Sequence, residues 1–223
     1  MTNLLEIDGI MFSTGVRQRS VEASGYLQEG GVLNICGPSG SGKTTLLRVL
    51  ARLKEVQKGK VMFRGESWRD FPPAEWRRLI HYLAQNPVIF DGTVLHNLAR
   101  PYELAALKKV GLRFNRERAV ELMEEVLLGP ELLEQDARTL SGGEASRLAL
   151  VRAMLAEPQV ILMDEPLAAL DQNTASAVLA LVDQWLKDRE GRGIVLVSHN
   201  GNFAEMPRLS MINLETQGGN PGE

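Results

Sequence analysis

The sequence predicts an α/β fold in which a mainly parallel sheet is covered by helices on both faces. Three apolar runs, at residues 32–36, 160–163 and 194–197, have the length of strands and lack the polar alternation of a half-exposed sheet. Such runs are typical of parallel strands that are buried on both faces. Amphipathic helical patterns at residues 44–53 and 173–187 lie between them, and this alternation of strands and helices favours the same fold class.

The other elements are predicted from hydrophobic spacing and from the positions of proline. Strands are expected at residues 4–7, 10–12, 61–63 and 80–83, and a helical turn that begins with proline at residues 72–78. From about residue 97 to 156 helix formers dominate, with apolar residues spaced as in Ala119, Leu122, Met123, Val126 and Leu127. This stretch is predicted to be a mostly helical insertion.

We expect a single domain over residues 1–223. The chain has 223 residues, of which 44% are hydrophobic, and this is enough for one large core with an inserted subdomain. The core is expected over about residues 1–85 and 157–215, and the helical subdomain over about residues 86–156. The tail at residues 216–223 has nothing to bury and is predicted to be flexible.

Composition favours a cytoplasmic protein. No apolar run approaches the roughly 20 residues that cross a bilayer, and the N-terminus lacks the layout of a signal peptide. Cys36 is the only cysteine, so no internal disulfide can form. A net charge of −3 offers no broad basic surface, and no direct nucleic acid partner is expected.

Residues 37–45 fit the pattern of a phosphate-binding loop, G-x-x-x-x-G-K-[ST]. Its glycines allow successive N–H groups to point inward around an anion, and the helix that follows adds its positive end. We expect Lys43 to reach the β- and γ-phosphates and the Thr44 hydroxyl to bind Mg²⁺. A mere glycine-rich connector is disfavoured, because strand, loop and helix follow in the required order. The predicted phosphate-binding residues are Gly37, Pro38, Ser39, Gly40, Ser41, Gly42, Lys43, Thr44 and Thr45.

Two carboxylates follow the apolar strand at residues 160–163, at the end where parallel sheets bind their ligands. Asp164 would hold Mg²⁺, directly or through water, and Glu165 could accept a proton from the water that attacks the γ-phosphate. A strand that simply exits into a solvated loop is the alternative, and the phosphate loop upstream makes the functional interpretation the stronger one.

The segment at residues 140–144 begins a further helix. Ser141 and Glu144 form an S-x-x-E capping box, and Gly142 and Gly143 would also let a phosphate approach the backbone. One chain has no evident need for two γ-phosphate sites. This second anion site is therefore expected to serve a nucleotide that is bound to another copy.

These motifs, taken in order, resemble those of the ATP-binding subunit of ABC transporters. The resemblance rests on the phosphate loop, Gln85, residues 140–144, residues 163–166, Asp171 and His199, and it covers nearly the whole chain. It implies a phosphate-loop NTPase core with a mainly parallel sheet, an N-terminal antiparallel β subdomain and an inserted α-helical subdomain. ATP, Mg²⁺ and ATP hydrolysis are implied with it, as is a peripheral place at the cytoplasmic face of the cell membrane.

The resemblance also implies partners. Two copies would sandwich two ATP molecules head to tail, each between the phosphate loop of one copy and Ser141, Gly142 and Gly143 of the other. ATP would close the two copies onto each other, and this closure would move separate transmembrane permease subunits. Residues 88–90 would suit a groove for a partner helix, with simple core packing as the alternative, and residues 90–98 resemble export-type subunits and small metal-export ATPases.

Further roles come from the resemblance alone. Gln85 matches a glutamine that contacts Mg²⁺ and the attacking water, His199 matches a histidine on the γ-phosphate, and Asp171 matches an aspartate that links the two active sites. The implied catalytic residues are Glu165, His199, Lys43 and Gln85, and the implied metal ligands are Thr44, Gln85 and Asp164.

The chain departs from the family pattern at a few positions. Thr14 stands where an aromatic residue usually stacks on adenine, and Phe12, two residues earlier on the same strand face, is expected in the core. We therefore expect weak adenine stacking and reduced discrimination between ATP and GTP. Ala168 replaces a frequent serine, and Glu144 a common glutamine.

Two other classes of function are less favoured than the transporter subunit. A soluble ABC-type ATPase that acts on nucleic acid or ribosomes would carry a long coiled coil or a second ATPase domain, and the sequence has neither. A phosphate-loop kinase would need an acceptor pocket in place of residues 140–144. The transporter subunit is the preferred hypothesis.

Overall fold

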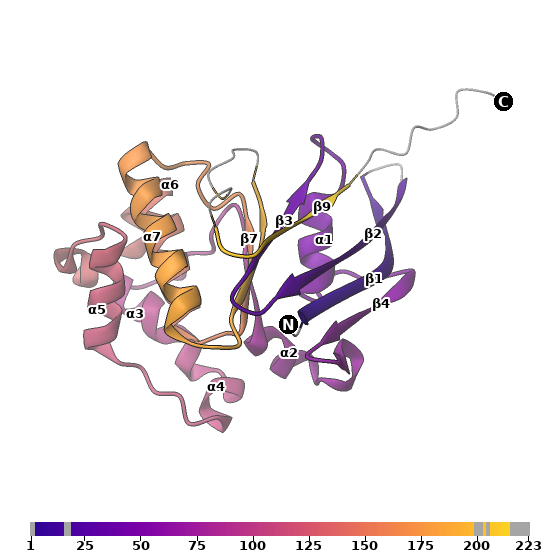
Figure 1. The fold of residues 1–223 in the computed structure, drawn as a ribbon. Helices are drawn as coiled ribbons and strands as arrows, with labels where there is room; N and C mark the ends of the chain where they lie inside the picture. Colours follow the sequence, from indigo (N-terminus) through magenta and orange to yellow (C-terminus); the bar gives the residue numbers. More distant parts are fainter. Residues whose placement is uncertain (1–2, 16–18, 199–202, 204–205, 215–223) are drawn as a thin grey trace.

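The computed structural model describes residues 3–15, 19–198, 203 and 206–214. Its described part holds a five-stranded sheet and a four-stranded sheet with helices around them. Figure 1 shows the antiparallel strands on one side of the molecule and most of the helices on the other, with the parallel strands between. The predicted α/β class is confirmed. The division into subdomains stays a prediction, and the tail at residues 216–223 lies outside the described residues.

The five-stranded sheet has the order β6-β7-β8-β3-β9, and all its strand pairs are parallel. Its strands are β3 (Val32–Cys36), β6 (Ile80–Leu83), β7 (Val160–Asp164), β8 (Gly193–Val197) and β9 (Leu209–Asn213). Every residue of β7 and β8 is buried, which explains the apolar runs without polar alternation. β9 was not predicted, because this edge strand carries exposed Met211 and Asn213 and shows no long apolar run.

The parallel sheet separates two hydrophobic cores. On one face lie helix α1 (Lys43–Leu50) and the antiparallel sheet, which pack with Leu162 and Val195. On the other face, α6 (Gly142–Leu155) and α7 (Gln172–Asp188) pack with Ile161 and Leu196. Since side chains alternate along a strand, neighbouring residues of one strand enter different cores.

The antiparallel sheet has the order β2-β1-β4-β5, with β1 (Asn3–Thr14), β2 (Arg19–Gln28), β4 (Lys58–Phe63) and β5 (Glu66–Ser67). β1 is one strand rather than the two predicted, and its register shifts between Ile7 and Ile10. Gly9 supplies the positive φ of 55° at this irregularity. β2 was missed, because exposed Glu22 and Ser24 alternate with small or short apolar residues.

Most of the helical elements between β6 and β7 are short. They comprise α3 (Val94–Ala99), η2 (Arg100–Glu103), α4 (Ala105–Lys109), α5 (Arg116–Glu125), η3 (Pro130–Glu134), η4 (Ala137–Thr139) and α6. One predicted helix end, that of the helix at residues 44–53, was wrong. α1 stops at Leu50 because Arg52 adopts a left-handed φ of 54°, and α5 stops at Glu125, before Leu127 with a φ of 58°.

The helical turn predicted at residues 72–78 is α2 (Pro73–Leu79), and η1 (Trp68–Asp70), which was not predicted, precedes it; the two carry an aromatic cluster. Trp76 is fully buried and packs edge-on against Phe63 and Trp68, at ring distances of 5.9 and 6.0 Å. Its indole Nε1 donates to the carbonyl of Leu50 at 2.8 Å and so satisfies an acceptor at the end of α1. Among the described residues, no helix combines the length and apolarity needed to span a bilayer.

We predict that Trp76→Phe lowers the free energy of unfolding by about 1–3 kcal/mol, because the carbonyl of Leu50 loses its buried donor. Urea denaturation in the absence of nucleotide measures this loss. Trp68→Phe is the matched control, since the buried Trp68 Nε1 has no acceptor within the described part of the chain. Equal losses in the two variants would show that the bond to Leu50 contributes nothing.

Candidate functional site

The phosphate loop joins the end of β3 to the first turn of α1. Gly37, Gly40 and Gly42 have positive φ values of 145°, 75° and 105°. A Cβ atom at Gly37 would meet the carbonyl oxygen of Leu214 at 2.6 Å, so a side chain is excluded there by space as well as by conformation. Gly42 is the N-cap residue of α1, and the helix therefore presents its free N–H groups to the loop.

The ammonium group of Lys43 lies over this loop. Its Nζ donates to the carbonyls of Gly37 at 2.8 Å and Pro38 at 3.1 Å, and the residue is only 7% exposed. The chain thus holds a buried positive charge at the place where a phosphate would lie. An anion at the loop would exchange these neutral acceptors for charged ones, which form stronger hydrogen bonds.

Asp164 is held between two hydroxyl groups. Thr44 Oγ1 donates to Asp164 Oδ1 at 3.0 Å, and the Tyr82 hydroxyl donates to Oδ2 at 3.1 Å. Burial raises the pKa of Tyr82, so the phenol keeps its proton and remains a donor. The structure therefore brings together Thr44 and Asp164, two of the three predicted metal ligands, and fixes the carboxylate in one orientation.

Gln85 and Glu165 meet at the ends of β6 and β7. Gln85 Nε2 donates to Glu165 Oε2 at 3.1 Å. Glu165 has a φ of 51°, which is uncommon for a residue with a side chain, and its backbone N–H donates to the carbonyl of Val197 at 3.0 Å. A strained backbone held by the neighbouring strand is a frequent feature of functional sites.

A cavity of about 160 Å³ opens beside this pair. Gln85, Asp164, Glu165 and Arg147 are among its lining residues. The cavity is large enough for several water molecules and is lined by polar groups that can bind them. Water can therefore reach the carboxylate of Glu165 from the side of the helical elements.

Tyr82 is the site residue that the sequence did not reveal. It lies on β6 in register with Leu162 of β7, two residues before Asp164. The bond between Tyr82 and Asp164 depends on β6 and β7 being neighbours in the sheet, and no local sequence pattern predicts this pairing.

The predicted capping box at the start of α6 is confirmed. Glu144 N–H donates to Ser141 Oγ, and Glu144 Oε2 accepts from the Ser141 N–H at 2.8 Å and from its hydroxyl at 2.7 Å. These bonds, the hydroxyl bond first, lower the pKa of Glu144 and keep it ionised. Ser141 and Gly142 are exposed, and a Cβ at Gly142 would meet nothing within 4 Å. The start of α6 therefore has room for a ligand such as a phosphate group.

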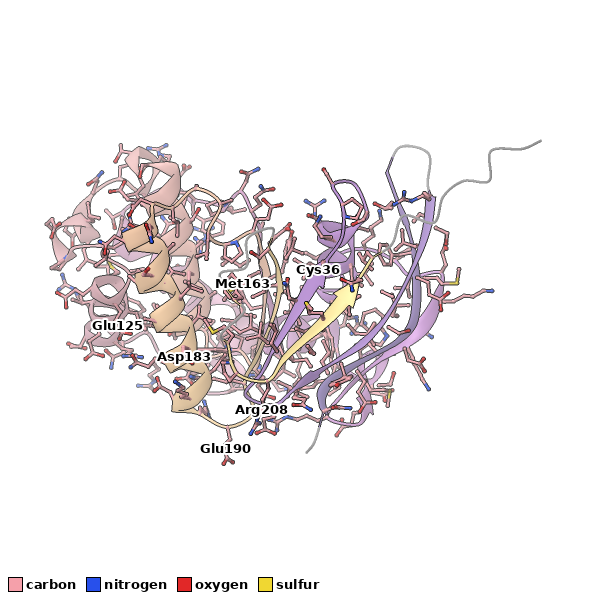
Figure 2. All side chains as sticks on the ribbon, turned by 45° about the horizontal axis from the view of Figure 1, so that its top comes forward. Cys36, Glu125, Met163, Asp183, Glu190 and Arg208 are labelled. Carbon is pink, nitrogen blue, oxygen red and sulfur yellow. The ribbon has the colours of Figure 1, made fainter. Side chains whose placement is uncertain are left out.

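This open helix start and the phosphate loop lie apart in one chain. α6 and α1 cover opposite faces of the parallel sheet (Figure 1). No hydrogen bond between described residues connects residues 141–143 with residues 37–45. Figure 2 shows Cys36 and Met163, which precede the loop and Asp164, in the central part of the molecule, whereas Glu125 and Asp183 lie among the helices.

Thr14 and Phe12 lie next to the phosphate loop, close to Gly42. Phe12 is fully buried, as expected, and its ring would lie 3.2 Å from a Cβ atom on Gly42. Thr14 is 8% exposed, and its hydroxyl lies 3.2 Å from that of Thr45. Neither residue offers an exposed ring beside the loop.

Other predicted residues are placed as follows. Asp171 caps α7, where its carboxylate accepts from the N–H of Thr174 at 3.0 Å and from its hydroxyl at 2.6 Å. The hydroxyl bond is the main cause of its lowered pKa. Ala168 lines the cavity near Glu165. His199 lies outside the described residues, so its role stays a prediction.

The segment at residues 88–90 is only partly exposed. Val88 is 60% exposed, whereas Ile89 packs against the helical core. The guanidinium groups of Arg100 and Arg152 lie over the ring of Phe90, at 4.6 and 5.0 Å from its centroid. The expected apolar surface is therefore reduced to Val88, because two cations cover the largest ring.

Comparison with known proteins gives close relatives. The family model described as ABC transporter matches residues 21–168. The phosphate import ATP-binding protein PstB of Tropheryma whipplei (strain TW08/27) is 35% identical over 212 residues, which cover 90% of this chain and 80% of that protein. The molybdate/tungstate import ATP-binding protein WtpC of Pyrococcus horikoshii is 37% identical over 168 residues, 75% of this chain and 47% of that protein.

A solved structure has the same fold. A bacterial Atm1-family ABC exporter with ATP bound matches with a TM-score of 0.79 at 22% identity, over 97% of this chain and 38% of that one. The chain spans about half the length of WtpC and of the spermidine/putrescine import ATP-binding protein PotA of Thermotoga maritima, at 47% and 46%. Because the family model covers more than half of the chain and PstB matches over most of both lengths, the chain belongs to the ABC transporter family, as an ATP-binding domain.

Proposed function

We propose that the chain hydrolyses ATP and that this reaction drives transport through separate membrane subunits. The observation that carries the proposal is the bond between Gln85 and Glu165 beside the Thr44–Asp164 pair, at one edge of the sheet next to the phosphate loop. This arrangement supports the proposal, because phosphoryl transfer needs groups that bind phosphate, hold a metal ion and activate water close to one another.

The phosphates bind first in the proposed reaction. N–H groups of the loop and of the start of α1 donate to the phosphate oxygens. Lys43 leaves the carbonyls of Gly37 and Pro38 and turns to the β- and γ-phosphates.

The residues present fit Mg²⁺. Within the part of the chain that the structure describes, His, Cys, Asp and Glu do not gather in groups of three or more, so protein side chains alone form no metal cage. Mg²⁺ is usually held by one or two protein ligands together with substrate phosphates and water, and Thr44, Asp164 and Gln85 suit this role. Bound there, Mg²⁺ would neutralise charge on the β- and γ-phosphate oxygens.

Glu165 then activates water. Its carboxylate takes a proton from a water molecule as the water oxygen forms a bond to the γ-phosphorus and the bond between that phosphorus and the bridging oxygen breaks. The terminal phosphate leaves with the water oxygen, and ADP keeps the bridging oxygen. Gln85 orients the water, and His199 is expected to contact the γ-phosphate.

A second copy completes the site in this proposal. Ser141 and Gly142 are exposed at the helix start that also includes Gly143, and this helix covers the face of the sheet opposite to α1. A helix start of this kind attracts a γ-phosphate that a second molecule presents. Two copies arranged head to tail would place each loop opposite such a helix start.

The membrane partner would be a permease that contacts the segment after Gln85, and the chain would act at the cytoplasmic face of the membrane. Exposed Val88 supports a contact in this segment. PstB and WtpC are named as import proteins for different cargoes, phosphate and molybdate or tungstate. The proposal therefore concerns the ATP-driven step that such proteins share rather than one cargo.

We predict that Glu165→Gln lowers ATP turnover by about 10²–10⁴-fold, because an amide of the same size cannot accept the proton. ATP binding should persist, and ATP should shift the variant from monomer to dimer in size-exclusion chromatography with light scattering. Glu190→Gln, which changes an exposed carboxylate after α7, is the matched control and should keep wild-type turnover. Wild-type turnover in Glu165→Gln would contradict the role of this residue.

We also predict that Tyr82→Phe raises the Mg²⁺ concentration for half-maximal turnover about tenfold, because Asp164 loses one of the two hydroxyl groups that orient it. A Mg²⁺ titration at fixed ATP measures this change. Tyr26→Phe, at an exposed tyrosine of β2, provides the control. An unchanged Mg²⁺ requirement in Tyr82→Phe would mean that Thr44 alone positions the carboxylate.

A further inference from the structure

The phosphate loop has two sides with different surroundings. On one side the Thr44 hydroxyl meets Asp164, close to Gln85 and Glu165. On the other side the Thr45 hydroxyl meets Thr14, near the end of β1. A nucleotide with its terminal phosphate beside Glu165 must therefore leave the loop, with its ribose and base, past the ends of β1 and β2.

Arg19 stands at this exit. It is the first residue of β2 and lies opposite Thr14 in the register of the two strands. Its Nη2 donates to the carbonyl of Gly40 at 3.3 Å, and the residue is half-buried. A guanidinium group thus makes one hydrogen bond to the loop, from the strand that pairs with β1 at Thr14.

A base at this exit meets no aromatic ring from β1. Phe12 is fully buried and Thr14 is 8% exposed. The exposed Tyr26 is seven residues further along β2 than Arg19, about 23 Å in an extended strand. The planar group that the described residues offer at the exit is the guanidinium of Arg19.

We propose that Arg19 binds the base of the nucleotide by stacking its guanidinium plane on the base. Arginine stacks on aromatic faces and is planar, whereas lysine is a flexible point charge. The bond to Gly40 holds the guanidinium beside the loop before the nucleotide arrives. The proposal rests on the nucleotide binding proposed above and adds the residue that contacts the base.

The test compares binding of ATP and of inorganic tripolyphosphate, which has the phosphates but no base, to the wild type, Arg19→Ala and Arg19→Lys in the presence of Mg²⁺. We expect Arg19→Ala to weaken ATP binding about tenfold and tripolyphosphate binding less than twofold. Arg19→Lys should restore only a small part of the ATP affinity. Arg77→Ala, which removes an exposed arginine from α2, should change neither ligand.

The possible outcomes separate the two proposals. An equal loss for both ligands that lysine restores would make Arg19 a phosphate contact and overturn the stacking role. Unchanged ATP binding in Arg19→Ala would also overturn it. A wild-type protein that binds neither ligand would overturn the proposed nucleotide binding itself. Stacking on a cation distinguishes bases weakly, so ATP and GTP should bind the wild type with similar affinities, and a large preference for ATP would contradict the stacking role.

Discussion

The parallel pairing of β6, β7, β8 and β3 is the constraint on which the candidate site depends. Parallel strands bring their carboxyl ends to one edge of a sheet. The phosphate loop follows β3, Glu165 follows β7 and Gln85 follows β6, so residues distant in sequence meet at this edge. The complete burial of β7 and β8 stabilises the arrangement, because a slip of one residue would move side chains into the wrong core.

The same sheet also lies between the helix that follows the phosphate loop and the helix that begins at Ser141. Its first core supports α1 and the phosphate loop, and its second core supports α6 with the exposed start at Ser141. Because the sheet lies between them, one chain cannot easily bring both to one phosphate. The capping box uses the N–H groups of Ser141 and Glu144 and not those of Gly142 and Gly143, so a capping role of Ser141 is compatible with a ligand at the two glycines.

Sequence reasoning succeeded where local chemistry decides the structure. The buried strands, the glycines of the loop and the capping box each follow from neighbouring residues. It failed where the partner is distant: β2 and β9 gain their stability from pairing with β1 and β3, and Tyr82 acquires a role only because β6 lies beside β7. The expected groove at residues 88–90 was reduced for the same reason, since Arg152 reaches Phe90 from α6.

In this structure the polar groups of the site form hydrogen bonds with one another. Lys43 is bonded to loop carbonyls, and Gln85 is bonded to Glu165. In the proposed cycle the nucleotide and the attacking water replace these bonds, as Lys43 turns to the phosphates and Gln85 to the water. Three residues after Gln85, the carbonyl of Val88 accepts a bond from Arg152 of α6 at 2.7 Å. Under the proposed function, a movement of Gln85 would be transmitted along this segment to Val88 and α6, and so to the surface where a membrane partner is proposed to bind.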